Sequence, residues 1–363
     1  MIQFEDIKHL NLGSLFLSAG GGEETRDAKF LCYTQTRKSP INLVQLANIE
    51  NSALVAIITF MGSPTVESEK NISSIQFNNI LKQAKNIMNE QISYIVPLGI
   101  GGATVFIPMF FAGMANLPIL DADCFGRCFS YLYLESPNLF QVPASVSFMT
   151  NFDGEVFILD CRKRPSNIEK HARRLANASH GACLIIPHVI TGEQAKKSLI
   201  PGTITQALTI GKLIEEKRSF EAITEYTKGK FWGMAGIVRI DKFGVKKRPF
   251  NLRFILEGMY DDRRFELYLE NEFFLLFEDG ECIAEAPDIV TLCHPFTCEP
   301  IPVTSLIVGT MVGICTMKAP DIWYTERGLS LVRNKLYNKS RDLAFATVNA
   351  SKNEPLTRLL RKP

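Results

Sequence analysis

The stretch of residues 97–130, PLGIGGATVFIPMFFAGMANLPILDADCFGRCFS, constrains the fold more than any other part of the chain. It opens on a glycine cluster at 99–102, continues as an apolar run at 105–115, and ends in an acidic turn with Asp121 and Asp123. Prolines and an asparagine interrupt the apolar residues, and the unbroken part is shorter than the roughly 20 residues that a membrane-spanning helix needs. We therefore expect a buried helix packed against a glycine-rich backbone, followed by a short buried strand that presents the two acids at its carboxyl end.

Alternating strand and helix signals precede this stretch. Residues 53–60 and 92–98 are continuous apolar runs typical of buried strands, and residues 30–33 and 42–46 are also rich in β-forming side chains. Between them, residues 75–88 carry apolar side chains at helical spacing. Strands that alternate with helices predict an α/β domain with a mostly parallel sheet and right-handed crossovers.

The length of the chain indicates two domains, because 363 residues exceed the roughly 250–300 at which a single core stops growing. The polar segment at 161–166 is the expected boundary. Residues 1–165 are predicted to form the α/β domain, with the glycine-rich site. Residues 166–363 are predicted to form an α+β, β-rich domain, since the pattern at 232–317 is β throughout.

The amino-acid composition limits the cellular compartment and the classes of partner that we expect for this chain. The chain has 40 basic and 38 acidic residues, so its net charge of +2 gives no electrostatic argument for nucleic acid or membrane. Its nine cysteines include no CxxC pair, and the first residues lack the basic and apolar pattern of a signal peptide. We expect a cytoplasmic protein with free thiols and a small-molecule ligand, and we leave a homo-oligomer open.

Three of the expected strand ends carry small or acidic residues, at 62–64, 99–102 and 121–127. The carboxyl ends of parallel strands meet at one edge of a sheet, where ligands bind in such folds. Asp121 and Asp123 are two residues apart, so an extended backbone points both side chains the same way and raises the pKa of one of them. That pair suits acid–base catalysis or a divalent metal; alternatively, both acids cap the following turn or pair with Arg127.

Further candidates come from glycines and from one histidine. The glycines at 20–22 precede a helix whose first turn already holds Glu23 and Glu24, which favours a close-packed turn or a loop over a neutral ligand rather than a phosphate site. His188 precedes a turn and is a candidate ligand contact, whereas Cys124 is interpreted as a small buried side chain because no histidine neighbours it in sequence. The candidate catalytic residues are Asp121, Asp123 and Arg127, and the candidate ligand-binding residues are Gly20, Gly21, Gly22, Gly62, Ser63, Gly101, Gly102 and His188.

Several motifs occur in the order found in one known family. They are Gly20-Gly21-Gly22, Met61-Gly62-Ser63-Pro64-Thr65-Val66 with Glu69-Lys70, Gly101-Gly102, Leu117-Pro118-Ile119-Leu120-Asp121-Ala122-Asp123 with Gly126-Arg127, Pro201-Gly202-Thr203 and Glu299-Pro300-Ile301. On these residues the chain resembles the DUF917 family, described through S-methyl thiohydantoin desulfurase and allied to hydantoinase/oxoprolinase proteins. The resemblance implies an α/β domain followed by a β-rich domain, and hydrolysis of small cyclic amide-like rings.

The chain also departs from the family pattern in its central stretch. The family usually has a Glu before Ile-Gly-Gly and an Asn shortly after it, where this chain has Gly99 and Thr104. After Gly-Arg the family usually has Pro-Glu, where this chain has Ser130-Tyr131. Two hypotheses follow. The chain is either a hydrolase-like enzyme acting on a hydantoin, S-methyl thiohydantoin or similar ring, or a catalytically degenerate relative that binds a small molecule or a protein partner. The cofactor stays unidentified, and a divalent metal is left open.

Overall fold

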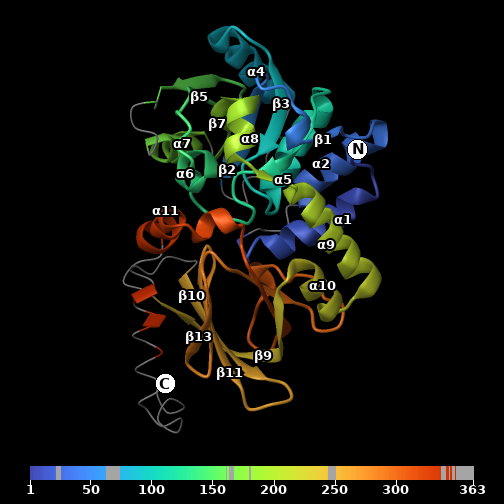
Figure 1. Ribbon diagram of the computed structural model, residues 1–363, viewed down its shortest axis with the longest axis vertical. Helices are drawn as coiled ribbons and strands as arrows, with labels where there is room; N and C mark the ends of the chain where they lie inside the picture. Colours follow the sequence, from blue (N-terminus) through green and yellow to red (C-terminus); the bar gives the residue numbers. More distant parts are fainter. Residues whose placement is uncertain are drawn as a thin grey trace. The chain divides into compact units, whose positions relative to one another are not determined.

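The computed structural model describes residues 1–21, 26–62, 74–160, 162, 167–179, 181–243 and 251–336, together with residues 341, 342, 344, 345 and 348 (Figure 1). The chain forms two compact units. Unit 1 contains Met1–Ser18 and Gly22–Lys212, and unit 2 contains Ala19–Gly21 and Leu213–Pro363. Unit 1 has an α/β fold and unit 2 is dominated by antiparallel strands, so the predicted fold class is confirmed.

Unit 1 is built on a mixed sheet with the strand order β1-β4-β3-β2-β7-β5-β6, and β8 pairs with β4. The first four strands in this order run parallel, whereas β7, β5 and β6 join by antiparallel pairing. The bounds are β1 (Leu43–Gln45), β2 (Leu54–Gly62), β3 (Ile92–Pro97), β4 (Ile119–Asp123), β5 (Ser147–Thr150), β6 (Val156–Leu159), β7 (Ala182–Thr191) and β8 (Ile200–Pro201).

Helices cover both faces of this sheet. The apolar helix α5 packs on β2, β3 and β4, and α7 packs on β2 and β7, so consecutive residues 54–58 of β2 are all buried. This double burial explains why the sequence of β2 is a continuous apolar run. The helices of the unit are α1 (Asp6–Leu17), α2 (Arg26–Lys38), α4 (Ser74–Met88), α5 (Ala103–Met114), α6 (Ser136–Leu139), α7 (Asn167–Ala178) and α8 (Gly192–Ser198), with the 3₁₀ helices η1 (Leu46–Asn48) and η2 (Leu132–Leu134). Helix α9 (Thr203–Lys217) begins in unit 1, and its residues from Leu213 onward belong to unit 2.

Two local predictions for unit 1 are wrong. Residues 30–33, predicted as β-rich, lie inside α2, because Ala28, Cys32 and Thr36 recur at a helical spacing of four and are all buried. The strand expected at 117–120 instead runs over Ile119–Asp123, so both acids lie within β4 rather than after it. By contacts the division between the two compact units falls after Lys212. The expected domain bounds, residues 1–165 and 166–363, stay a prediction.

Unit 2 contains a sheet of antiparallel neighbours with the strand order β13-β12-β11-β10-β9-β15-β14. One of its faces carries a core of apolar side chains that includes Phe254, Leu267 and Ile314. The strands are β9 (Lys230–Lys242), β10 (Asn251–Gly258), β11 (Arg264–Glu270), β12 (Glu272–Glu278), β13 (Glu281–Glu285), β14 (Ile289–Cys293) and β15 (Met311–Met317). The helices are α10 (Phe220–Thr227), α11 (Glu326–Leu329), the 3₁₀ helices η3 (Val303–Ser305) and η4 (Asp321–Tyr324), and a π-helical stretch, Ser330–Leu336.

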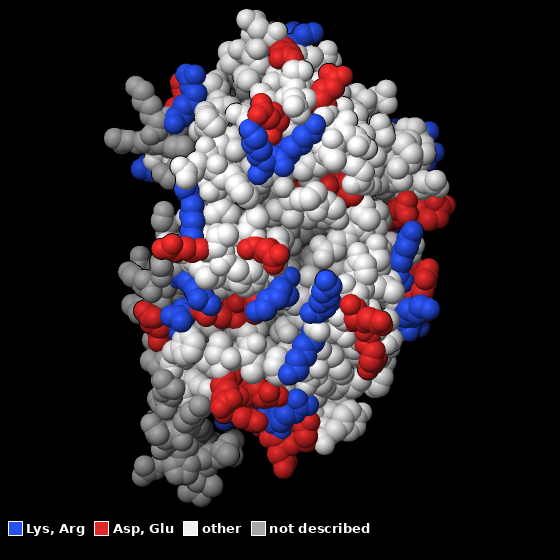
Figure 2. Space-filling view, in the orientation of Figure 1, with Lys and Arg blue, Asp and Glu red and all other residues white. Residues whose placement is uncertain are grey.

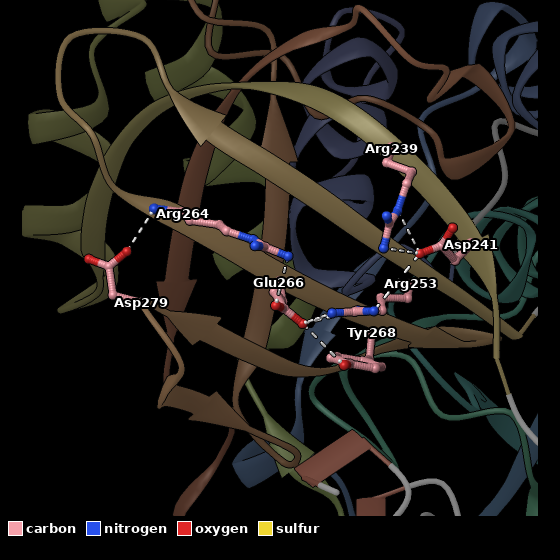
Figure 3. A network of polar contacts seen from close by, with 7 residues as sticks. All are labelled: Arg239, Asp241, Arg253, Arg264, Glu266, Tyr268 and Asp279. Atoms are coloured by element: carbon pink, nitrogen blue, oxygen red, sulfur yellow. Dashed lines mark hydrogen bonds and ion pairs between the residues drawn. The ribbon is translucent and has the colours of Figure 1, made fainter. Parts of the chain in front are cut away.

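The opposite side of β10 and β11 carries a buried polar network (Figure 3). Glu266 Oε2 accepts from Arg253 Nε and Nη2 at 3.0 and 2.6 Å, and from the Tyr268 hydroxyl at 3.3 Å. Glu266 Oε1 lies 3.3 Å from Arg264 Nη2. Both carboxylate oxygens of this buried acid therefore have cationic or hydroxyl partners, and the network joins adjacent strands.

Helix hydropathy and surface charge of the described residues bear on the partners that the protein can have. No helix among them is long and apolar enough to cross a membrane. On the face shown in Figure 2, acidic and basic side chains are interspersed.

Candidate functional site

Asp121 is a buried residue of β4 whose hydrogen bonds link that strand to β1 and α9. Its Oδ2 accepts from Gln45 Nε2 of β1 at 2.9 Å and from the Thr205 hydroxyl at 2.5 Å, and its Oδ1 accepts from Thr205 N at 2.9 Å. Its backbone carbonyl accepts from Gly202 N at 2.7 Å. Thr205 lies in the first turn of α9, where a carboxylate complements the free N–H groups of the helix. All these partners are structural, so the carboxylate holds α9 and β1 against β4.

Asp123 lies two residues further along β4 in a different environment. Its Oδ1 accepts from Gly126 N at 2.7 Å, which caps the following turn. Complete burial raises the pKa of Asp123 well above its usual value, although hydrogen bonding from the Gly126, Phe125 and Ile100 N–H groups and the Thr203 hydroxyl lowers it in part. Among the described residues, neither Asp123 Oδ2 nor the Thr203 hydroxyl has a hydrogen bond of ordinary geometry. Burial thus favours the neutral acid.

Arg127 is completely buried directly after that turn. Its Nε donates to the Cys128 carbonyl at 3.1 Å, and its guanidinium carbon lies 4.6 Å from the centre of the Phe129 ring. These contacts hold the segment that follows β4. A catalytic role for Arg127 stays a prediction.

The glycines at 99–102 allow that same segment to approach the end of β3. A Cβ on Gly99 would lie 2.9 Å from the Phe125 ring, and one on Gly101 would lie 3.3 Å from Cys128 Cβ. Gly102, at the start of α5, has φ +52°, a conformation that glycine adopts without strain. The close approach that the sequence indicated here is made by residues 125–128 of the chain itself.

The other candidate glycines are also packed against their own unit. A Cβ on Gly62 would lie 2.3 Å from Ala182 Cβ of the paired strand β7. Gly20 and Gly21 belong to unit 2, where a Cβ on Gly20 would lie 2.5 Å from the Phe273 ring. Ligand binding by these glycines stays a prediction. Two further candidates, Gly22 and Ser63, lie outside the residues that the structure describes.

His188 forms a buried ion pair that joins β7 to the segment after β4. Its Nε2 contacts Glu135 Oε1, and the two residues are 5% and 4% exposed. Burial lowers the pKa of His188, but the Glu135 charge and its hydrogen bond together outweigh burial and leave that pKa raised. The pairing therefore favours an imidazolium beside a carboxylate in a place that water barely reaches.

We call Asp123, Cys124, Glu135, Ser136 and His188 the His188 cluster, because the His188–Glu135 contact and a backbone hydrogen bond from Ser136 to Cys124 connect His188 to the residues at the end of β4. Ser136 N donates to the Cys124 carbonyl at 2.9 Å, which fixes the two segments side by side. Burial, and then the Glu135 and Asp123 carboxyl groups, raise the pKa of the Cys124 thiol well above its usual value. Within the described part of the chain, Asp123 Oδ2, Glu135 Oε2 and Ser136 Oγ are buried without a hydrogen-bond partner. Buried polar atoms are usually paired, so each of these three atoms is a candidate contact for a ligand or water.

A resident metal does not fit the donors that the structure describes. No group of three or more His, Cys, Asp or Glu side chains among those residues could hold a metal ion. The Asp121 oxygens, which the acid pair would have offered, already accept from N–H and O–H donors. No step below depends on a metal.

Sequence reasoning singled out Asp123 and His188 as candidates but not Glu135 and Ser136. Their one sequence signal is an acid followed by Ser-Pro directly after the apolar and aromatic run at 129–134. Such an acid is either a helix-flanking residue or a buried partner, and only the pairing with a strand more than fifty residues later distinguishes the two.

Comparison with known sequences now identifies the family. The model described as "S-Me-THD-like, N-terminal domain" matches residues 5–161, and the one described as "S-Me-THD-like, C-terminal domain" matches residues 163–342. The chain belongs to the S-Me-THD-like family. The resemblance expected from the glycine and aspartate motifs is thereby confirmed. No curated protein matches this S-Me-THD-like chain.

A solved structure shares the fold of this S-Me-THD-like protein. A protein from Chromobacterium violaceum superposes with a TM-score of 0.77 at 17% identity, over 93% of this chain and 96% of that one. At that identity the likeness shows the fold alone.

Proposed function

We propose that this protein is a hydrolase-like enzyme acting on a small cyclic amide, such as a hydantoin or an S-methyl thiohydantoin, at the His188 cluster. One observation carries the proposal: the buried His188–Glu135 pair is connected, through the hydrogen bond from Ser136 N to the Cys124 carbonyl, to the end of β4, where burial favours the protonated form of Asp123. Ionisable side chains in one site that differ in protonation supply an acid and a base at the same pH. Family membership supports the ring chemistry.

Glu135 and His188 would carry the proton transfers. Glu135 Oε2, unpartnered among the described residues, takes a proton from the water that attacks the ring carbon. The protonated His188 gives a proton to the departing ring nitrogen, or to methanethiolate when a C–S bond breaks. The proton then passes from Glu135 to His188 along their existing contact, which restores the starting state.

Asp123 would bind the ring oxygen. A neutral carboxyl donates a hydrogen bond to an oxygen that gains negative charge as water adds, whereas a carboxylate would repel it. The turn N–H of Gly126 already holds Oδ1, so Oδ2 is the oxygen left to face a ligand.

Cys124 is a poor nucleophile in this arrangement. The thiolate is the reactive form of cysteine, and the raised pKa of Cys124 keeps the thiol protonated. The proposal therefore uses direct attack by water rather than a thioester intermediate.

One observation favours the alternative of a binding protein without turnover. Gly99, Gly101 and Gly62 are packed against Phe125, Cys128 and Ala182, and every member of the His188 cluster is buried. A relative that retains the cluster but encloses it would bind a small molecule without releasing product.

The two candidates are separated by assay and calorimetry on the same preparation. Hydantoin, 5-oxoproline and S-methyl thiohydantoin are incubated with the wild type, Glu135→Gln and His188→Gln, and ring opening and methanethiol are measured. We expect turnover by the wild type and its loss in both variants. Binding heat without turnover supports the alternative. Neither binding nor turnover of any of these rings rejects the ring-hydrolase proposal, and turnover that survives in both variants rejects the assigned residues.

A further inference from the structure

Helix α7 holds the segment that carries Glu135 from outside the His188 cluster. Leu132 N donates to Glu169 Oε2 at 2.7 Å. Leu132 is the first residue of η2, so its N–H has no partner inside that short helix. Glu169 is 9% exposed, and a buried carboxylate on a backbone N–H makes a strong charge-assisted hydrogen bond.

Arg173, one turn further along α7, fixes the other oxygen of Glu169. Arg173 Nε and Nη2 both lie 2.6 Å from Glu169 Oε1. The same Nη2 donates to the Ser130 carbonyl at 3.2 Å, and the guanidinium carbon lies 5.7 Å from the centre of the Tyr131 ring. Glu169 is therefore locked in one orientation, and α7 contacts the segment at three successive residues.

One further backbone hydrogen bond links the contact between Glu169 and Leu132 to Glu135, the acid of the ion pair. The Leu132 carbonyl accepts from Glu135 N at 3.2 Å, while the Leu132 N–H is held by Glu169. The Tyr131 carbonyl accepts from Leu134 N at 3.1 Å and completes the turn. A shift of Leu132 would thus move the Glu135 backbone, and its side chain would leave His188.

We infer that Glu169 is a positioning residue, which sets η2 so that Glu135 meets His188. Its importance for turnover rests on the proposed function. The geometry that it sets does not, because the contact between His188 and Glu135 can be measured in an inactive protein. Asp123 and Cys124, the other titratable groups of the cluster, are unchanged in all the variants below.

The test follows the titration of His188 by NMR in protein labelled with ¹³C-histidine. The chain has five histidines, and His188→Gln identifies the signal by its loss. We expect Glu169→Ala to lower the His188 midpoint by about 1 pH unit, since a neighbouring opposite charge contributes on that scale. The value should approach that of Glu135→Gln. Lys170→Ala, at an exposed position on the same helix, is the matched control and should leave the midpoint unchanged.

Two more variants separate positioning from general damage. Glu169→Gln retains an oxygen that accepts from Leu132 N, so its midpoint should stay closer to the wild type than that of Glu169→Ala. Arg173→Ala, at a half-exposed position, should lower the midpoint by less than Glu169→Ala does. An unchanged midpoint in folded Glu169→Ala overturns the inference. If Glu169→Ala does not fold, an unchanged midpoint in Arg173→Ala overturns it.

Activity distinguishes this inference from the proposed function. If the wild type turns over a ring substrate, Glu169→Ala should lose about 10–100-fold in kcat with KM retained, the scale expected for misplaced catalytic groups. If the wild type turns over none, the proposed function fails, while a lowered His188 midpoint in Glu169→Ala still supports the positioning role.

Discussion

Glu266 in unit 2 and Glu135 in unit 1 are both buried against a cationic side chain, and the two acids differ in how completely they are paired. In unit 2, Glu266 has Arg253 and Tyr268 on one oxygen and Arg264 on the other. In unit 1, Glu135 meets His188 through Oε1, whereas Oε2 has no partner among the described residues.

This difference separates a structural acid from a candidate functional one. A buried charge that is fully hydrogen-bonded fixes strands together, and removing one partner leaves the other charge uncompensated. A buried acid with one unpaired carboxylate oxygen lowers the stability of the fold, and ligand-binding sites often contain such destabilising groups. The same contrast exists within β4, where Asp121 is fully paired and Asp123 is not.

The largest expected effect on the free energy of unfolding concerns Glu266, the acid whose two carboxylate oxygens both have partners. Glu266→Gln should destabilise the protein by about 3–5 kcal/mol, because Arg253 is left buried without its counter-charge. Urea unfolding followed by fluorescence measures the change. Glu193→Gln, which breaks the exposed pair with Lys197, is the control and should leave the midpoint unchanged. A Glu266→Gln midpoint equal to that of this control would remove the contrast between the units.

Asp121→Asn should give the next largest effect, a loss of about 1–3 kcal/mol for broken buried hydrogen bonds. The carboxylate accepts from the Thr205 N–H, the Thr205 hydroxyl and the Gln45 amide, and the amide group of Asn cannot accept all three. The same unfolding experiment measures it. An Asp121→Asn variant that is as stable as the wild type would indicate that Asp121 is a candidate functional acid rather than a structural one.

The His188–Glu135 pair should give a smaller effect, on the order of 1 kcal/mol, with a distinctive pH dependence. The folded-state pKa of His188 is raised, so the pair stabilises fully below the ordinary imidazole pKa of about 6.5, and this stabilisation is lost as pH rises through the raised pKa. In Glu135→Gln only burial acts, which lowers the His188 pKa, so stability should rise with pH over that window. Melting temperatures of both proteins between pH 5 and 9 test this; parallel curves would contradict it.

Asp123→Asn should have the smallest effect at neutral pH. The raised folded-state pKa means that ionisation favours the unfolded chain above the ordinary Asp pKa of about 3.9. Asn has no proton to lose, so the variant should equal the wild type or exceed it by up to about 1 kcal/mol at pH 7. The difference should close below about pH 4. A clear loss of stability at pH 7 would mean that Asp123 is a structural carboxylate like Asp121.

The sequence predicted the parts of the fold that depend on local patterns. The apolar runs at 53–60 and 92–98 are β2 and β3, and the β pattern at 232–317 is the sheet of unit 2. The error at 30–33 shows the limit, because Phe-Leu-Cys-Tyr favours a strand by propensity while its burial follows a helical period set by α5. At residues 30–33, tertiary packing outweighs the strand propensity of the side chains.

Sequence patterns indicate members of the candidate site that lie at one strand end, but not members that are brought in from distant segments. Asp123 and His188 were singled out from strand and turn signals. Glu135 was not, because its partner is set by the antiparallel pairing of β7 with β2 and by the turn through η2. At Gly99 and Ser130-Tyr131 the chain lacks two acids that the family usually has, yet Glu135 lies just beyond that stretch and is buried.

The position of β7 has a consequence for how such proteins can recombine. This strand belongs to the sequence matched by the C-terminal family model, yet it lies between β2 and β5, which come from the N-terminal one. A hybrid joined near residue 162 would unite a foreign β7 with a β2 and β5 that never evolved beside it. We expect the two halves to be inherited together, since neither can exchange partners without refitting the middle of one sheet.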